Sequence, residues 1–153
     1  IGTSYEGYHA AKMHTMFLGP RIRMHQCIQE AEEAVMQALA AMCKSSFDGN
    51  HARQVANVGL TLLRRCKGWT PCQRLGYSIG CAQGCVDWGE AHVISISSES
   101  PHVLKEGHTL HMIPHMKHAE FGCIGFSKTV VVGKVYACDL SYTVPGKGIT
   151  TYI

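Results

Sequence analysis

The chain has 153 residues, of which 16% are charged, and its formal net charge is +3. This length suits one domain that buries roughly two-thirds of the surface exposed by its unfolded chain. Basic residues are scattered apart from Arg64–Lys67, and the longest aliphatic run, Val130–Val132, is far too short to span a membrane. We therefore expect no nucleic-acid or membrane partner and a cytoplasmic location. The chain begins on Ile1 rather than on methionine, so we also expect a fragment.

Eight cysteines would be enough for four disulfides. Four of them fall in a predicted helix or in apolar strand-like runs, where we expect small buried hydrophobic side chains: Cys27, Cys43, Cys123 and Cys138. The other four could be drawn as a zinc site, but their gaps form no matching pairs: Cys66, Cys72, Cys81 and Cys85. A chain of this length has a core without disulfides, so a reducing compartment is expected.

The N-terminal part predicts a hairpin followed by a long helix. Residues Ile1–Leu18 are rich in strand formers, with Glu6–Gly7 as the turn. From Arg21 to about Cys43, apolar residues recur at three- and four-residue steps: Ile28, Ala31, Val35, Leu39 and Met42. This stripe predicts a helix face in the core.

A second helix is predicted from Asp48, its expected N-cap, to about Arg65, with Val55, Val58 and Leu62 on one face. Two helices joined by a short loop should pack as an antiparallel pair. After a connection at 68–72, the periodicity changes to two and predicts four strands: His92–Ser97, Thr109–Pro114, Cys123–Val132 and Val135–Leu140. This order predicts an α+β domain with a mainly antiparallel sheet and its helices on one face.

Groups that transfer protons are concentrated in one stretch. Gly76–Gly80 contains Tyr77, and Asp87–Glu90 follows with two carboxylates. Glycine lets the backbone approach a ligand closely, and Asp-Trp-Gly-Glu suits a loop, where site residues concentrate. Phenol, carboxylate and imidazole are the usual acid and base groups of enzymes. The stretch predicts an active site; the alternative is a polar turn between two strands.

Several segments of the chain, taken with the long helix, follow a known order of motifs: GYHAAKMHTMFLG at 7–19, RLGYSIG at 74–80, DWGE at 87–90, VLKEGHTLH at 103–111 and SKTVVV at 127–132. This order resembles the pita-bread superfamily, which includes methionine and Xaa-Pro aminopeptidases, prolidase, creatinase and ectoine hydrolase. The resemblance covers residues 1 to about 140, and the segments at 76–80 and 87–90 are most similar to the ectoine hydrolase-like branch of the Xaa-Pro peptidases. The resemblance implies a curved, mainly antiparallel sheet and a partial C-terminal catalytic-type domain, 1–153, without its N-terminal portion.

The resemblance also implies where metal ligands would lie. Peptidases of this superfamily hold two metal ions with two aspartates, one histidine and two glutamates. The first aspartate would precede Ile1, and the other four positions hold residues that are poor ligands for hard cations: Ala11, Tyr77, Ile113 and Ser127. We therefore expect no metal and no other cofactor.

Creatinase and ectoine hydrolase imply a metal-independent cleavage of a small amide or amidine C–N bond. His9 or His111 would deprotonate water or protonate the leaving nitrogen, because unperturbed imidazole titrates near pH 6.5. Asp87 or Glu90 would orient that imidazole or act as the base. Tyr77 would donate a hydrogen bond to the developing oxyanion.

Other residues limit or extend this hypothesis. Trp88 and His92 are candidate substrate-binding residues, and the substrate would be a small molecule or dipeptide-like compound. Two glutamates of creatinase correspond to Met13 and Ile113, so neither the mechanism of creatinase nor that of ectoine hydrolase can apply in full to this chain. The alternative is a catalytically silent pseudo-peptidase kept as a binding or assembly module. An incomplete domain would expose a sheet edge, so we expect a homo-oligomer or pairing with the missing part of the domain.

A group of histidines leaves two interpretations open: His102, His108, His111, His115 and His118. They could be surface or structural imidazoles, or they could bind a soft metal adventitiously. Spacings of three suit a helix, whereas a strand would turn such a pair to opposite faces.

Overall fold

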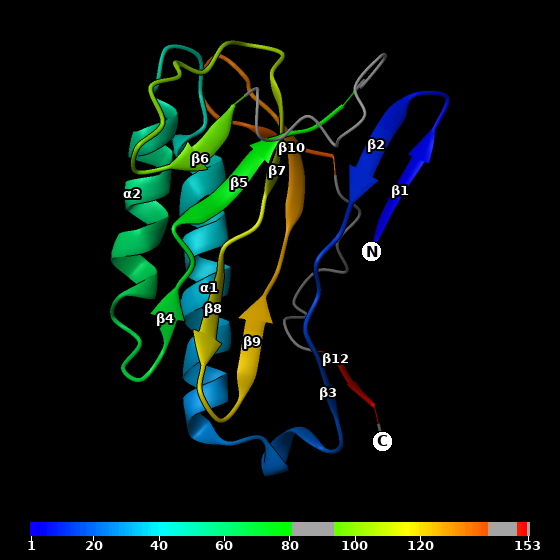
Figure 1. The fold of residues 1–153 in the computed structure, drawn as a ribbon, viewed down its shortest axis with the longest axis vertical. Coiled ribbons are helices and arrows are strands. Elements are labelled where there is room, and N and C mark those ends of the chain that lie inside the picture. Colours follow the sequence, from blue (N-terminus) through cyan, green and yellow to red (C-terminus); the bar gives the residue numbers. More distant parts are fainter. Residues whose placement is uncertain (81–93, 141–149, 153) are drawn as a thin grey trace.

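The computed structural model describes residues 1–80, 94–140 and 150–152. Two helices, α1 (Gln26–Ser45) and α2 (Ala52–Leu63), lie side by side on one face of a five-stranded sheet (Figure 1). Neighbouring strands in that sheet are antiparallel, and their order is β11 (Cys138–Asp139), β10 (Lys128–Val131), β7 (Thr109–Met112), β5 (Arg74–Ser78) and β6 (Ser95–Ser97). The predicted α+β class, with a mainly antiparallel sheet and helices on one face, is confirmed.

Three smaller sheets complete the described part of the chain. The hairpin of β1 (Gly2–Tyr5) and β2 (Tyr8–Ala11) turns at Glu6 and Gly7, whose φ angles are 47° and 81°. The predicted extent of the hairpin, Ile1–Leu18, is wrong: the hairpin ends at Ala11, and β3 (Met16–Leu18) pairs in parallel with β12 (Thr150–Tyr152). The third sheet is antiparallel and contains β4 (Thr70–Pro71), β8 (His115–His118) and β9 (Gly122–Gly125).

The first helix starts later than its periodicity suggests. Arg21–Arg23 form a 3-10 turn, and the chain is extended at Met24 and His25 before α1 begins. The imidazole Nδ1 of His25 accepts a hydrogen bond from the backbone N–H of Cys27 at 3.2 Å and so caps the helix. The predicted apolar stripe is confirmed, since four of its five members are at most 2% exposed: Ala31, Val35, Leu39 and Met42.

The second helix corrects two predictions. Asp48 is not its N-cap: α2 is capped at His51, and the Asp48 carboxylate accepts a 3.1 Å bond from the backbone N–H of Glu106. Val58 lies outside the buried face with 38% exposure, because that face is formed by Ala52, Val55, Ala56, Gly59, Leu60 and Leu63.

Three predicted strands are divided or shortened. Thr109–Pro114 ends at Met112, because the chain passes Pro114 into β8, a strand of another sheet. Cys123–Val132 is interrupted at 126–127, between β9 and β10, and Val135–Leu140 contains only the short β11. Within the described part of the strand predicted at 92–97, Ser95–Ser97 form β6.

Two further expectations are wrong. The predicted connection at 68–72 includes the short strand β4, and Cys123 and Cys138 are exposed rather than buried. The core lies between the helices and the sheet, where Leu75, Leu110 and Met112 are fully buried. Within the described ranges, each helix is too short or too polar to cross a membrane.

Candidate functional site

Three polar side chains form a row across the face of the sheet that the helices do not cover. In the strand register, His111 is the direct partner of Tyr77 on β5 and of Thr129 on β10. Successive strand residues point to opposite faces, and Leu110 and Met112 are buried in the core. His111 therefore faces away from the helices, together with its two partners.

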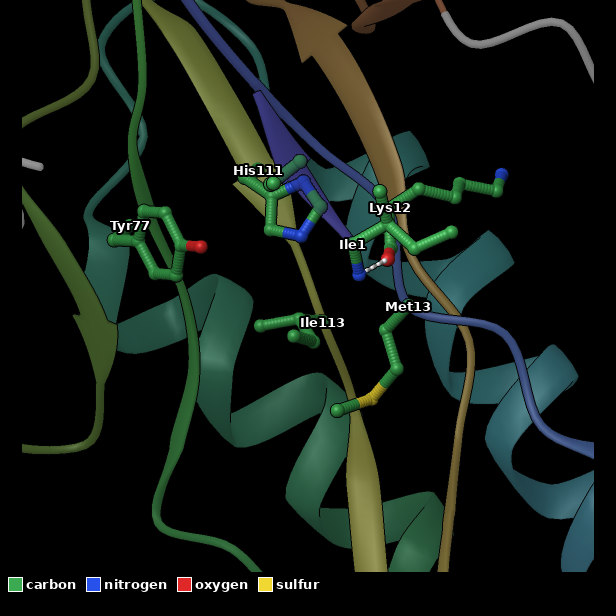
Figure 2. A pocket seen from close by; sticks show the side chains of 8 residues that line it. Ile1, Lys12, Met13, Tyr77, His111 and Ile113 are labelled. Atoms are coloured by element: carbon green, nitrogen blue, oxygen red, sulfur yellow. Dashed lines mark hydrogen bonds between the residues drawn. The ribbon is translucent and has the colours of Figure 1, made fainter. Parts of the chain in front are cut away.

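A cavity of about 280 Å³ opens beside this row. Figure 2 shows the Tyr77 hydroxyl directed toward the His111 ring, with Ile113 and Met13 beyond them. The β1–β2 hairpin, the segment after it, β5 and the β7 region supply its lining residues: Ile1, Gly2, Ala11, Lys12, Met13, Tyr77, His111 and Ile113. Segments far apart in the sequence thus meet at one site.

His111 is fully buried at this cavity. Its Nδ1 lies 3.5 Å from the hydroxyl oxygen of Thr129, and its Nε2 makes no hydrogen bond with any group of the described chain. Burial, and to a smaller extent the positive charges of Lys12 and of the Ile1 amino group, lower the pKa of His111 to about 4. The imidazole is therefore neutral at physiological pH.

The ammonium group of Lys12 points away from Tyr77 and His111 (Figure 2). Its Nζ donates a 3.0 Å hydrogen bond to the backbone carbonyl of Ser127. Burial lowers the pKa of Lys12, while the charge of Asp139 acts in the opposite direction. Lys12 contributes its backbone and alkyl chain to the cavity rather than a charge directed into it.

Two other residues of β5 shape the surroundings of Tyr77. The guanidinium carbon of Arg74 lies 5.1 Å from the centre of the Tyr77 ring, a cation–π contact. At Gly76, an added Cβ would lie 2.7 Å from the carbonyl oxygen of His111. Glycine is therefore required where β5 and β7 approach each other at this row.

The side chains at the implied metal positions do not fit a pair of metal ions. Ala11, Tyr77 and Ile113 line the same cavity, so these positions converge. At the fourth position, the Ser127 hydroxyl accepts a hydrogen bond from the Met13 N–H. Alanine and isoleucine offer no donor atom, and across the described ranges no three His, Cys, Asp or Glu side chains are grouped to hold a metal.

The structure brings together two of the predicted catalytic residues, Tyr77 and His111, whose ring centres are 5.2 Å apart. His9 lies on β2, where its backbone N–H donates to the Gly80 carbonyl at 2.9 Å, but it is not among the described residues lining the cavity. The remaining predicted site residues lie outside the described residues: Asp87, Trp88, Glu90 and His92.

Sequence reasoning missed Thr129 and the cavity contribution of Lys12. Thr129 joins the row through the β7–β10 register, which the sequence does not state. Lys12 lies in the motif segment 7–19, but its type alone does not distinguish a cavity wall from a solvated surface.

Three other histidines of the group stabilise local backbone. Nδ1 of His108 accepts from the Lys105 N–H and Nδ1 of His118 from the Glu120 N–H, each at 3.1 Å. Nδ1 of His115 is 2.8 Å from the Ile113 carbonyl oxygen. These contacts support the structural interpretation of those imidazoles.

Residues 1–134 match metallopeptidase family M24, and the chain belongs to that family. Solved structures share its fold. An X-Pro aminopeptidase from Thermotoga maritima superposes with a TM-score of 0.80 at 20% identity, covering 99% of this chain and 40% of that one. A dipeptidase from Pyrococcus horikoshii gives 0.82 at 18% identity, covering 99% and 39%. The predicted resemblance to the pita-bread superfamily is confirmed, whereas its ectoine hydrolase-like branch stays a prediction.

A more distant solved structure is the N-terminal domain of the FACT complex subunit SPT16 from chickpea. It has a TM-score of 0.68 at 14% identity and covers 89% of this chain and 32% of that one. This chain spans about 40% of the length of the aminopeptidase and dipeptidase structures. Among curated proteins, no sequence matches it.

Proposed function

We propose that this M24 chain is part of a hydrolase that cleaves a small amide or amidine C–N bond without paired metal ions. The supporting observation is that Tyr77 and His111 line one cavity together with Ala11 and Ile113, where metal ligands of the family would lie. Hydrolysis adds water across the C–N bond. The water oxygen bonds to the carbon and loses a proton, the C–N bond breaks, and the leaving nitrogen takes up a proton. A base and an acid must transfer these protons.

We assign the proton transfers to His9, whose backbone N–H bonds to the Gly80 carbonyl but which is not among the described lining of the cavity, and to the carboxylates of Asp87 and Glu90. Burial disfavours the protonated form of His111, so it is a weak base at physiological pH. Tyr77 would donate a hydrogen bond to the developing oxyanion.

The proposed substrate is a small peptide-like or N-acyl compound. The solved relatives named above include an aminopeptidase and a dipeptidase. A cavity of about 280 Å³ is at the small end of ligand sites, which also favours a small substrate. Trp88 and His92 would bind it.

The test is a screen of N-acyl amino acids, Xaa-Pro dipeptides and small cyclic amidines, with and without a chelator. We expect turnover that survives the chelator. His9→Ala and Glu90→Gln should each lower it by roughly a hundred- to ten-thousand-fold, with little change in Tm. His102→Ala, at an exposed histidine, is the control and should retain activity. Turnover that vanishes with chelator would contradict the metal-independent mechanism.

A second candidate is a catalytically silent module for binding or assembly. It is supported by the non-ligand side chains at Ala11 and Ile113 and by the fold shared with a domain of SPT16, a subunit of a complex. No turnover on any substrate class would favour this candidate. Chelator-resistant turnover that depends on His9 would exclude it.

A further inference from the structure

Nε2 of His111 is a buried nitrogen with no hydrogen-bond partner among the described residues. Nearly all buried polar atoms in proteins have such a partner, so an orphaned one needs an explanation. His111 also lines the cavity of about 280 Å³. The position of Nε2 therefore indicates that its hydrogen-bond partner is an atom of a ligand in that cavity.

Tyr77 places a second polar group at the same spot. Its ring centre is 5.2 Å from that of His111, with 44° between the ring planes, and its hydroxyl is directed toward the imidazole (Figure 2). The two residues are direct cross-strand partners, and the Arg74 guanidinium lies against the Tyr77 ring. Both side chains are thus held by strand pairing rather than by a loop, which favours a preorganised site.

The contact with Thr129 bears on which nitrogen of His111 carries the proton. Its hydroxyl is the polar group beside Nδ1, at 3.5 Å. If this hydroxyl donates to Nδ1, the neutral imidazole carries its proton on Nε2. The N–H group then faces the cavity as a hydrogen-bond donor.

The rest of the lining indicates an uncharged ligand group. Ala11, Met13 and Ile113 are apolar, and both cationic groups of the lining are engaged by carbonyls: the Lys12 ammonium points away and donates to Ser127, and the Ile1 amino group donates to Lys12 at 2.9 Å. Among the described lining side chains, none is a carboxylate. Neutral donors surrounded by apolar groups suit a carbonyl oxygen, and they act more strongly there than in water.

We propose that the Tyr77 hydroxyl and His111 Nε2–H form a pair of neutral donors for one carbonyl oxygen, so that this site takes a small amide or lactam. In this role the pair replaces metal ions as the electrophilic element of an M24 site. Thr129 is a positioning residue that selects the tautomer. This inference rests on the proposed hydrolase function and names the group of the substrate that the cavity holds.

The first test compares two probes on the full chain by NMR titration. 2-Pyrrolidinone carries a carbonyl oxygen, and 2-pyrrolidinethione has the same ring with sulfur, a poor hydrogen-bond acceptor. Since two neutral hydrogen bonds are at stake, the lactam should bind at least about fivefold more tightly. Equal affinities, or tighter binding of the thiolactam, would overturn the proposal.

Variants assign the preference to its donors. Tyr77→Phe and His111→Leu should each reduce the lactam preference, whereas His111→Gln, which keeps an N–H donor, should retain part of it. The matched controls make similar changes at exposed residues: Tyr136→Phe and His102→Leu should bind like the original chain. A preference that survives in both Tyr77→Phe and His111→Leu would overturn the proposal.

The tautomer can be read on the unaltered chain, so the proposal can fail even if the variants do not fold. Long-range ¹H–¹⁵N spectra should show His111 protonated at Nε2, with that nitrogen shifting when lactam is added. Thr129→Val should weaken this tautomer and Thr129→Ser should restore it. An Nδ1-protonated imidazole in the original chain would overturn the proposal. Lactam preference without turnover would refute only the hydrolase, and turnover without lactam preference would refute only the donor pair.

Discussion

The hydroxyl oxygen of Ser127 accepts a 2.7 Å hydrogen bond from the backbone N–H of Met13. The backbone N–H of Ser127 in turn donates to the Met13 carbonyl at 3.0 Å, and Ser127 is only 2% exposed. These bonds join the segment after β2 to the start of β10. A position that the family resemblance assigns to a glutamate ligand therefore stabilises the fold here.

Ser127→Ala should lower the free energy of unfolding by about 1–3 kcal/mol, because it removes the hydroxyl partner of a partly buried N–H. Urea denaturation measures the effect. The control is Thr61→Ala, which removes an exposed side-chain bond to the Asn57 carbonyl and should change stability by about 0.5 kcal/mol or less. Equal effects of the two substitutions would show that the Ser127 contact is unimportant.

Chelator-washed protein should contain no pair of tightly bound metal ions. Ala11 and Ile113 have no ligand atom, and the Ser127 hydroxyl is engaged by Met13. Elemental analysis, followed by back-titration with manganese, cobalt and zinc, tests this expectation. Two tightly held equivalents per chain would show that the assignment of ligand positions is wrong.

Stability should fall as the pH drops from about 6.5 toward about 4. His111 titrates at about 4 in the folded chain, whereas an unfolded histidine titrates near 6.5. In this window the unfolded state binds a proton that the folded state does not, so acid favours unfolding, by about 3 kcal/mol across the window. Unfolding measured at several pH values should show a smaller slope for His111→Gln, while His102→Gln should keep the original slope. Identical slopes for all three proteins would contradict the burial of a neutral His111.

Gly76→Ala should destabilise the chain more than Gly59→Ala. A Cβ at Gly76 would meet the His111 carbonyl oxygen at 2.7 Å, and backbone in a sheet cannot easily move. At Gly59 the nearest atoms, at 2.7 and 2.8 Å, belong to the side chains of Met42 and Leu75, which can adjust, and alanine favours a helix. We expect a loss of about 1–3 kcal/mol for Gly76→Ala and a smaller change for Gly59→Ala. Calorimetry of both variants would contradict this reasoning if the order were reversed.

The N-terminal segment should mediate association with another chain. Its side chains include several exposed apolar groups: Tyr5, Tyr8, Met16, Leu18 and Ile22. Burying such groups against a second copy would remove apolar surface from water. Light scattering should therefore show association at high concentration, and Leu18→Glu should weaken it while Val135→Glu, also at an exposed position, should not. A stable monomer at high concentration would contradict this prediction.

Local patterns in the sequence were sufficient for several features. The apolar stripe through Ala31, Val35 and Met42 predicts the buried face of α1, because helical periodicity repeats within a few residues. The turn at Glu6–Gly7 follows from the same kind of short-range signal. The absence of ligand atoms at Ala11 and Ile113 can also be read from residue types, once the resemblance identifies the positions.

Contacts between distant segments decided the rest. Asp48 is a good N-cap by type, but its carboxylate bonds to Glu106, 58 residues away, and the helix starts at Ala52 instead. The run from Cys123 to Val132 resembles one continuous strand in its sequence, yet the chain passes from one sheet to another within it. The side-chain period of a strand is the same in every sheet, so it does not reveal which strands pair.

The candidate site also depends partly on residue types that the sequence shows and partly on contacts that only the folded chain makes. Sequence alone identified Tyr77 and His111 as groups capable of acid–base or hydrogen-bond chemistry. Their meeting depends on the register between β5 and β7, and the neutrality of His111 depends on burial by residues from several segments. Register and burial are properties of the packed chain, because a shift of one residue would turn His111 toward the helices and leave Tyr77 without its partner.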